Sequence, residues 1–404
     1  MKTHTPLHLA DLQLSALNYF GPLRKLLADL HTYKPHPNRK LFYDGYVSLL
    51  LLCYFNPIIR GLRQIEQMSN FKKIQKELGV SHAALGSLSE ASRVFDPKPL
   101  AGIFTDLASQ VSAVDKPELP KEIPEAMQLI AVDGTLMDAL SRMLWAVWLE
   151  KYENAAKVHL HFNVSRGVPV LMELTEGNGN EMQSLKAHLL AACIYLIDRG
   201  YVDYQLYQAI LEAGSSFVAR LRCNAAMEVL KTRPLTAADL AAGVESDQEV
   251  WLGDAKTGTR LSRPVRVIKV HVKNSPARNL KPQCAKVNGK VKIIRTHEEE
   301  FDAWLVTDRL ELPAEIIALL YRYRWQVETF FRWFKCVLGC RHLFAESPEG
   351  LALQIYAALI AGLLIVLWTG RKPTRYTLSA LAFYFQGWAT WEELRRELDK
   401  LKPG

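Results

Sequence analysis

The chain has 404 residues, more than one compact domain usually holds, so we expect two or three domains. Hydrophobic residues make up 49% of the sequence and charged residues 23%, values that exclude a collagen, a coiled-coil rod and a disordered tail. The formal net charge of +8 is concentrated, because residues 255–297 contain twelve Lys or Arg and no acid. This basic window carries +12 and leaves −4 on the rest of the chain, so a polyanionic partner is expected at one segment.

The first hundred residues have a helical pattern. Apolar residues recur at three- and four-residue spacing from Leu7 to Leu107, and the apolar run Tyr46–Phe55 predicts a buried helix. A short helix with a serine N-cap is expected over Ser87–Arg93. Three prolines in Asp115–Pro124 end the helical region and make this stretch the best candidate for a linker.

Residues 127–222 change to a pattern of strands and helices. Short apolar runs bounded by turn residues predict buried strands, and alternating polarity on both sides of a Ser-Arg-Gly turn predicts a hairpin. The expected elements are strand Met127–Val132, hairpin Lys157–Val164 with Val168–Leu174, helix Glu181–Ala192, strand Cys193–Ile197, helix Tyr204–Ala213 and strand Ser216–Leu221. This order predicts a mixed sheet flanked by helices, an α/β (α+β) fold.

From residue 223 the pattern becomes irregular. Short β-like pieces such as Val265–Val272 and Lys290–Arg295 are separated by Gly, Pro and Asn, and they contain the basic window. After a strand at Ala303–Val306, one long helix is predicted from Leu312 to Leu338, and Pro313 suits its first turn. Further helices are expected from there to residue 404.

Six scattered cysteines and an N-terminus without signal-peptide features lead us to expect a cytoplasmic protein. Cys336, Cys340 and His342 raise the question of zinc, but cysteines four apart on a helix are more often ordinary packing. The apolar stretch Leu351–Trp368 is at the lower limit for crossing a bilayer. We favour a buried core helix there, because no second convincing span accompanies it.

Two acids follow the expected buried strands directly. Asp133 comes after Met127–Val132, and Asp198 comes after Cys193–Ile197. Ligands of open α/β sheets bind at the carboxyl ends of strands, although an aspartate there also often caps the next turn. Two such acids in one small sheet favour a functional site.

The long helix adds a third acid, Glu328. At about 100° per residue, one narrow stripe of a continuous helix holds this acid with a phenol and three cations. The members of the stripe are Tyr321, Arg324, Glu328, Arg332 and Lys335. A solvated helix face usually mixes charges in pairs, whereas this stripe offers one carboxylate for a metal and several donors for phosphate oxygens. Trp325 beside it is a candidate for contact with an unstacked base.

Three carboxylates from two strands and a helix form a site for two hard cations with oxygen ligands. Two Mg²⁺ ions at such a site serve in-line displacement at a phosphodiester and need no side-chain nucleophile. We find no serine, cysteine or histidine arrangement that indicates such a nucleophile. Nucleotide cofactors are not expected either, because the sequence has neither a dinucleotide fingerprint nor a P-loop.

The motifs Asp133-Gly134-Thr135, Asp198-Arg199-Gly200-Tyr201 and Tyr321-x2-Arg324-x3-Glu328-x6-Lys335 resemble those of bacterial insertion-sequence transposases of the DDE type. The similarity is closest to the insertion sequence 4 family, with its Y-(2)-R-(3)-E-(6)-K signature. The resemblance covers residues 127–340 well. It implies an RNase H-like catalytic core, interrupted by a mostly β insertion and flanked by N-terminal and C-terminal helical regions.

The resemblance also implies roles for the matching residues. Asp133, Asp198 and Glu328 would be catalytic and would ligate two Mg²⁺ ions, with Mn²⁺ as a substitute. The phosphate-binding residues would be Tyr321, Arg324, Arg332, Lys335 and Arg199. The partners would be double-stranded DNA, as terminal inverted repeats and as target, and a second subunit in a paired-end homodimer. The family works by cut and paste, through a DNA hairpin, in the bacterial cytoplasm at the nucleoid.

We expect five regions along the chain. They are an N-terminal helical region for DNA-end recognition (1–122), the first part of the core (123–222), the basic β-rich insertion (223–302), the final strand and catalytic helix (303–345) and a C-terminal helical region (346–404).

Three alternatives stay open: another RNase H-like DNA endonuclease, a catalytically silent DNA-binding regulator, and a membrane protein. The stripe and the basic insertion count against a simple nuclease, and the three carboxylates count against a silent regulator. The membrane protein would rest on Leu351–Trp368 alone.

Overall fold

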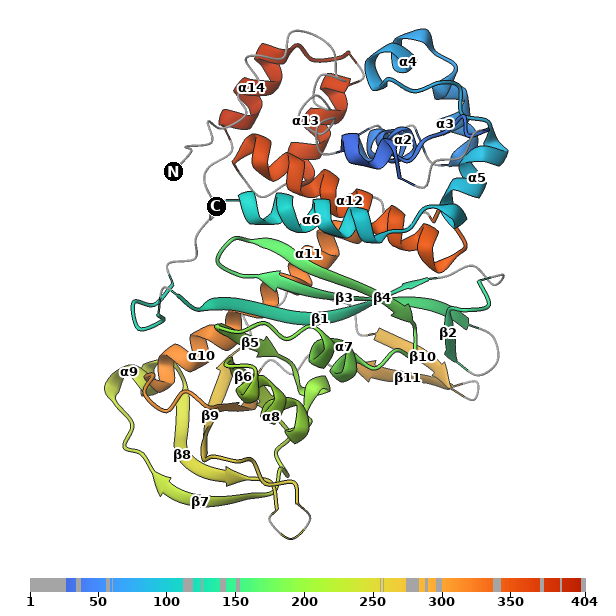
Figure 1. The fold of residues 1–404 in the computed structure, drawn as a ribbon. Helices are drawn as coiled ribbons and strands as arrows, with labels where there is room; N and C mark the ends of the chain where they lie inside the picture. The colour runs from blue at the N-terminus through green and yellow to red at the C-terminus, as the bar shows by residue number, and fades with distance from the viewer. Residues whose placement is uncertain are drawn as a thin grey trace. The chain divides into compact units, whose positions relative to one another are not determined.

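The structure is a computed structural model in which the chain divides into two compact units (Figure 1). The first unit takes the described residues of Met1–Leu119, Asp133–Glu181 and Gln326–Gly404, and the second takes those of Pro120–Val132 and Met182–Trp325. The described residues are 27–33, 38–55, 59, 61–111, 119–124, 126–138, 143–149, 153–254, 256, 258–273, 283–287, 290–295, 300–336, 343–370, 374–385 and 387–400.

Helices dominate the first unit. They are α2 (Tyr43–Phe55), α3 (Leu62–Ser69), α4 (Lys72–Leu78), α5 (Leu85–Val94), α6 (Lys98–Gln110), α12 (Pro348–Thr369), α13 (Arg375–Phe385) and α14 (Trp391–Asp399). The helical N-terminal region expected from the sequence is therefore confirmed for the part that the structure describes. The helix predicted at Ser87–Arg93 begins earlier, at Leu85, and Ala84 rather than a serine precedes it.

The apolar stretch Leu351–Trp368 lies in α12, which is the core helix of the first unit. Helices α2, α5 and α6 and strand β4 (Val168–Glu176) all contact it. Among the described residues it is the one helix long and apolar enough to cross a membrane, and 89% of its apolar window is buried inside the protein. Its polar Gln354 is also buried, and its Oε1 accepts the N–H of Phe344 at 2.8 Å. Packing within the protein thus accounts for the apolar composition.

The first unit also holds a group of strands. They are β2 (Val147–Leu149), β3 (Glu153–Asn163), β4 and the second half of β1 (Gln128–Asp138). Strands β3 and β4 pair antiparallel, and Gly167 supplies the left-handed residue of the turn between them at φ 69°, so the predicted hairpin is confirmed. Helix α11 (Trp325–Cys336) buries Val327, Phe331 and Phe334, and its Phe330 ring lies 5.4 Å from that of Phe162 on β3.

The second unit is built on strands in the order β1-β5-β6-β12-β9-β8-β7. The first half of β1, β5 (Cys193–Ile197) and β6 (Ser216–Leu221) run parallel, and the pairings from β6 onward are antiparallel. The remaining elements are η3 (Arg199–Tyr201), α8 (Tyr204–Glu212), β7 (Met227–Thr232), α9 (Ala237–Ala241), β8 (Val244–Leu252), β9 (Val265–Lys273), β12 (Glu300–Thr307) and α10 (Ala314–Tyr323). Strands β10 (Gln283–Val287) and β11 (Lys290–Arg295) form a separate antiparallel pair.

Strand β1 is common to both units, since it pairs with β5 in the second and neighbours β3 in the first. The core strands therefore have the order β4-β3-β1-β5-β6, the mixed α/β arrangement of an RNase H-like sheet. The mostly β segment after β6 enlarges this sheet through β12, β9, β8 and β7. The expected fold class is confirmed.

Two predicted helices are wrong in extent. Helix α7 (Glu181–Ala187) ends at Ala187 instead of Ala192, because the chain beyond it bonds to other elements. The N–H of Leu190 donates to the Tyr195 hydroxyl at 2.7 Å, and Ala192 turns into β5 with a positive φ of 55°.

The single helix predicted from Leu312 to Leu338 is two helices, α10 and α11, which part at Arg324. The N–H of Arg324 bonds to the carbonyl of Tyr321, three residues back instead of four, at 3.2 Å. Because α10 and α11 fall mostly in different units, the stripe calculated for one continuous helix stays a prediction as a whole.

Candidate active site

Asp198 stands directly after β5, whose five residues are all buried, so the core of the second unit fixes its position. Its Oδ1 accepts the main-chain N–H of Arg199 at 2.7 Å and thereby caps the turn of η3. The side chain nevertheless remains 41% exposed. Asp198 thus caps a turn and still presents a carboxylate to a ligand.

Two residues of α10 and its end converge on this carboxylate. The Tyr321 hydroxyl donates to Oδ1 of Asp198 at 3.0 Å, and Nη2 of Arg324 lies 4.0 Å from Oδ2. The Arg324 Cζ atom lies 5.7 Å from the ring centroids of both Tyr321 and Trp325, so the guanidinium is close to two aromatic rings. Arg324 is buried, whereas Trp325 is 55% exposed. Tyr321 and Arg324 are three residues apart in helical backbone, so both lie on the side that faces Asp198.

These contacts set the charge state of the site. Burial alone would raise the pKa of Asp198, but the charge of Arg324, the N–H of Arg199 and the Tyr321 hydroxyl together lower that pKa below its ordinary value. Burial and the neighbouring Asp198 charge raise the pKa of Tyr321. At neutral pH the site therefore contains an ionised carboxylate and a phenol that still has its proton to donate.

Sequence reasoning missed Arg220. Its charge lowers the pKa of both Asp198 and Tyr321, which puts it close to the pair. The residue lies on β6, next to β5, and is the single charged residue of the strand Ser216–Leu221. A lone cation in a core strand beside a strand that ends in an aspartate is the signal that would have identified it.

Asp133 lies inside β1, whereas the sequence predicted it just beyond the end of a strand. Its Oδ1 accepts the N–H of Gly134 at 2.9 Å, the same bond to the next residue that Asp198 makes. A Cβ atom at Gly134 would lie 2.8 Å from Oε1 of Glu181, so this position leaves room for glycine only while Glu181 stays in place. The Glu181 carboxylate is paired with Lys157 at 3.2 Å.

Glu328, Arg332 and Lys335 all belong to α11 and share one face of it, because they are four and seven residues apart. The neighbouring side of α11 carries the buried Val327 and Phe331. The Lys335 ammonium donates to the main-chain carbonyl of Leu136 on β1, so α11 and β1 are linked in the first unit. This part of the predicted stripe survives the break at Arg324, and Arg332 is exposed.

The structure brings Tyr321, Arg324 and Asp198 together within the second unit. Asp133, Glu328 and Lys335 belong to the first unit. Arg199 is exposed beside Asp198.

Part of the basic window is neutralised inside the protein. Arg266 pairs with Asp247 at 2.5 Å, Arg263 pairs with Asp308 at 2.7 Å, and Lys269 lies between Glu245 and Asp302 at 2.5 and 2.9 Å. Arg260 pairs with Glu228. These cations form ion pairs within the second unit, so fewer than twelve positive charges of the window are left to bind a polyanion.

Among the described residues, one group of metal-ligand type gathers away from these acids. Glu245, His271 and Asp302 have ligand atoms within 4.8 Å of one another. The Lys269 ammonium already bridges the two carboxylates, so the group is satisfied as an ion-pair network. Of the residues considered for zinc, Cys336 ends α11, and Cys340 and His342 lie outside the described residues.

A mixed α/β core of RNase H-like strand order, with an aspartate on β1, another directly after β5 and a glutamate on a following helix, defines the class of carboxylate-bearing RNase H-like proteins. A family model described as transposase DDE domain matches residues 124–364. The chain belongs to this family, whose members use divalent metal ions to cleave and transfer DNA strands.

The similar proteins carry the same designation. The chain is 26% identical over 228 residues to a putative transposase y4zB of Sinorhizobium fredii, and 23% identical over 333 residues to a putative transposase for insertion sequence element IS4SA of Synechocystis. It is 25% identical over 267 residues to a probable transposase for insertion sequence element IS5377 of Geobacillus stearothermophilus.

These matches cover 56%, 80% and 64% of the chain and 56%, 82% and 63% of the relatives in turn. A solved structure of the piggyBac transposase synaptic complex with hairpin DNA aligns with 96% of the chain and 85% of that protein, at a TM-score of 0.45 and 10% identity.

Proposed function

We propose that this chain is a cut-and-paste DNA transposase, which hydrolyses phosphodiester bonds at the ends of an insertion sequence and transfers the freed strand to target DNA. The observation that carries the proposal is the convergence of Tyr321 and Arg324 on Asp198, at 3.0 and 4.0 Å. Three residues of two separate signature motifs form one contact set, which a chance match of the motifs would not produce.

Asp133, Asp198 and Glu328 are the proposed ligands of two Mg²⁺ ions, for which Mn²⁺ would substitute. The donor chemistry fits, because hard cations take carboxylate oxygens and Asp198 is an ionised, 41% exposed carboxylate. The bond from each aspartate to the next N–H fixes the side-chain rotamer before any ion binds. When bound, such ions lower the pKa of an attacking water or hydroxyl and stabilise the leaving oxygen.

The protein residues contribute orientation and charge. The Tyr321 hydroxyl donates to Oδ1 of Asp198 and so restrains the orientation of the carboxylate. Arg324 favours the ionised form of that carboxylate, and contacts with the Tyr321 and Trp325 rings stabilise its guanidinium beside it. The guanidinium of Arg324 is the proposed donor to a phosphate oxygen of the scissile strand, whereas the single proton of the Tyr321 hydroxyl is already donated to Asp198.

The proposed DNA contacts extend outward from this centre. Arg199, Arg332 and Lys335 would neutralise phosphates near the element's end, as Arg324 would, and the neutral Tyr321 would lie against the same backbone. Trp325, more than half exposed beside Arg324, would stack on an unpaired base. Residues 1–122 would recognise the terminal inverted repeats. Two subunits would act together in a paired-end complex at the nucleoid, in the bacterial cytoplasm.

The test is cleavage of a labelled duplex that carries the element's end, in Mg²⁺, by the full chain. Glu328→Gln should abolish cleavage and leave DNA binding intact, because it removes one charged oxygen ligand from an otherwise unchanged helix. Glu349→Gln is the matched control and should cut like the wild type, because Glu349 is exposed in the first turn of α12. Equal cutting by wild type and Glu328→Gln would show that the metal-site assignment is wrong.

A further inference from the structure

The six residues that join β12 to α10, 308–313, and the first turn of α10 are held at four points by other residues of the second unit. Asp308 accepts bonds from the Phe217 N–H at 3.0 Å and the Ser216 hydroxyl at 3.1 Å, and it pairs with Arg263. The carbonyls of Leu310 and Leu312 and the N–H of Glu315 each bond to a side chain of the insertion. The partners in turn are Arg233 after β7, Arg266 on β9 and Asp239 on α9. Such dense anchoring of a short connection needs an explanation.

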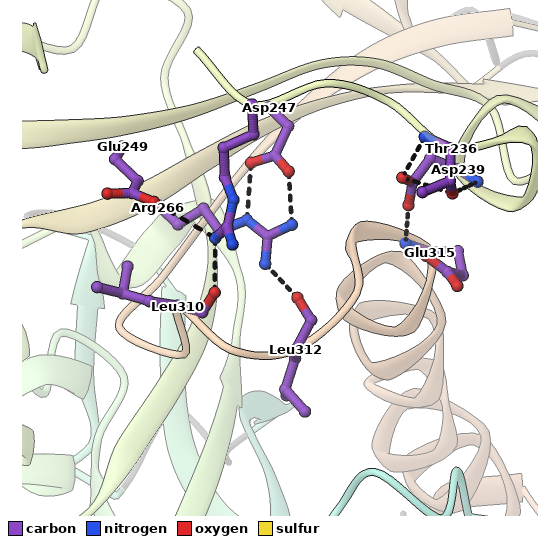
Figure 2. Close-up of polar contacts among 9 residues, drawn as sticks. Thr236, Asp239, Asp247, Glu249, Arg266, Leu310, Leu312 and Glu315 are labelled. Atoms are coloured by element: carbon purple, nitrogen blue, oxygen red, sulfur yellow. Dashed lines mark hydrogen bonds and ion pairs between the residues drawn. The ribbon is translucent and has the colours of Figure 1, made fainter. Parts of the chain in front are cut away.

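The strongest anchor is Arg266 on β9 (Figure 2). Its Nε and Nη2 form a two-bond fork with Asp247 of β8 at 2.7 and 2.5 Å, and its Nη1 donates to the carbonyl of Leu312. Both charged residues are buried, with 3% and 2% exposure. A buried ion pair contributes little net stability compared with apolar residues of the same size, but it holds both side chains in one geometry. Here it fixes the position of the Leu312 carbonyl, two residues before α10.

Two more contacts act on the same segment. Arg233 donates to the carbonyl of Leu310 at 2.5 Å, next to Glu249 at 3.6 Å. Asp239, the third residue of α9, uses Oδ2 in a capping box with Thr236 and leaves Oδ1 to accept the N–H of Glu315 at 3.0 Å. Figure 2 shows this cap at the start of α10, and Pro313 provides no side-chain cap of its own. Helix α10 thus receives its N-terminal cap from α9.

Helix α10 connects these anchors to the catalytic centre. Glu315 and Tyr321 are six residues apart on one uninterrupted helix, about 9 Å at 1.5 Å per residue. A helix this short transmits a shift at its start to its end without bending. Tyr321 must reach Oδ1 of Asp198 within hydrogen-bond distance, so small errors at Leu312 would remove that bond.

We propose that the β-rich insertion braces helix α10, with Arg266 and Asp247, Arg233 and Asp239 as positioning residues for Tyr321 and Arg324 at Asp198. The proposal rests on the transposase function above, and it assigns to these members of the insertion a task other than holding DNA. Their side chains are engaged by the segment 308–315 and are not available to phosphates.

The main test variant is Arg266→Met with Asp247→Leu, which replaces the buried pair by apolar side chains and removes the donor to Leu312. It should melt within a few degrees of the wild type and bind the DNA end within about two-fold, yet cleave at least ten-fold more slowly in a single turnover. Arg233→Met, which changes a partly exposed side chain and leaves the core intact, should cleave at least three-fold more slowly. The matched control is Arg260→Met, which removes a cation of the same window whose acidic partner is Glu228 on β7.

A coupling measurement separates positioning from general damage. The double variant should slow cleavage by less than half as many fold in a Tyr321→Phe background as in the wild-type background. Both changes disable the same contact, so their effects should not multiply. Wild-type cleavage by the double variant, or decreases that multiply in full with Tyr321→Phe, would overturn the proposal.

Amide hydrogen exchange over residues 314–324 gives a readout that does not depend on activity. Exchange there should be about ten-fold faster in both brace variants and unchanged in Arg260→Met. If the wild type does not cut DNA, the proposed function is wrong. The exchange result would still test whether these residues hold helix α10 in place. Unchanged exchange in both brace variants would overturn it.

Discussion

Replacing Tyr321 with phenylalanine isolates one hydrogen bond of the candidate site. The substitution keeps the ring, and with it the 5.7 Å contact with the Arg324 guanidinium, but removes the hydroxyl that donates to Oδ1 of Asp198 at 3.0 Å. A bond to a charged acceptor contributes about 1.5–3 kcal/mol when it is buried. Because the Asp198 side chain is 41% exposed, solvent screening reduces this to about 1–2 kcal/mol.

If the bond aims the carboxylate during catalysis, that free energy appears in the rate. At about 1.4 kcal/mol per factor of ten, Tyr321→Phe should cleave a labelled element end roughly 5- to 30-fold more slowly in a single-turnover assay. Tyr204→Phe on α8 is the control and should cleave at the wild-type rate. Wild-type cleavage by Tyr321→Phe would refute the orienting role, and complete inactivity like that of Glu328→Gln would refute the magnitude.

Three further predictions concern charge, burial and packing. Lys290→Glu with Lys292→Glu should weaken DNA binding and lower the slope of log affinity against log salt by about 0.9 for each phosphate that the protein no longer neutralises, whereas an unchanged slope would remove β11 from the DNA path. The hydroxyl of Tyr207 is buried without a hydrogen-bond partner among the described residues, so Tyr207→Phe should leave the free energy of unfolding unchanged or raise it by about 1 kcal/mol. Burial raises the pKa of Tyr207 in the folded protein, so the wild type loses folding free energy as the pH rises above about 10, where the unfolded phenol ionises first. In urea titrations between pH 10 and 12, the free energy of unfolding of Tyr207→Phe should therefore fall less than that of the wild type. A Cβ atom at Gly350 would lie 2.7 Å from the carbonyl oxygen of Ser92, so Gly350→Ala should lower the free energy of unfolding by about 1–3 kcal/mol, and an unchanged denaturation midpoint would contradict the packing of α5 on α12.

The sequence was informative where a pattern is local. The β3–β4 hairpin, strands β5 and β6 and helix α8 follow from apolar runs, alternation and turn residues, and the structure has each of them. The apolar stretch in α12 was recognised as a core helix for the same reason, since its neighbours in sequence offered no second span.

Features that depend on distant partners could not be predicted. The division of the predicted helix at Arg324 has no glycine or proline to signal it, and the contact of the buried Arg324 with Asp198 joins residues that are far apart in the sequence. The predicted helix end at Ala192 was wrong because Tyr195 and Ser215 take up the backbone bonds of the preceding segment. The pattern of residue types along the chain does not show which distant side chains will bond to the backbone of this segment.

The basic window illustrates the same limit for function. Counting charges in 255–297 suggested a surface for a polyanion, but Arg266 is buried against Asp247 and a main-chain carbonyl. An arginine written in a basic run and an arginine that braces a helix are identical in sequence. Only the acid that faces it, on the neighbouring strand, distinguishes the two.

We propose that Asp133, Asp198 and Glu328 hold the metal ions with which the protein cuts DNA. The most direct measurement is the number of Mn²⁺ ions bound per active site in the complex of the full chain with an element end, counted by electron paramagnetic resonance. The wild type should bind about two ions. Asp133→Asn, Asp198→Asn and Glu328→Gln should each bind fewer while still binding the DNA. A wild-type count of ions in all three variants would contradict the claim.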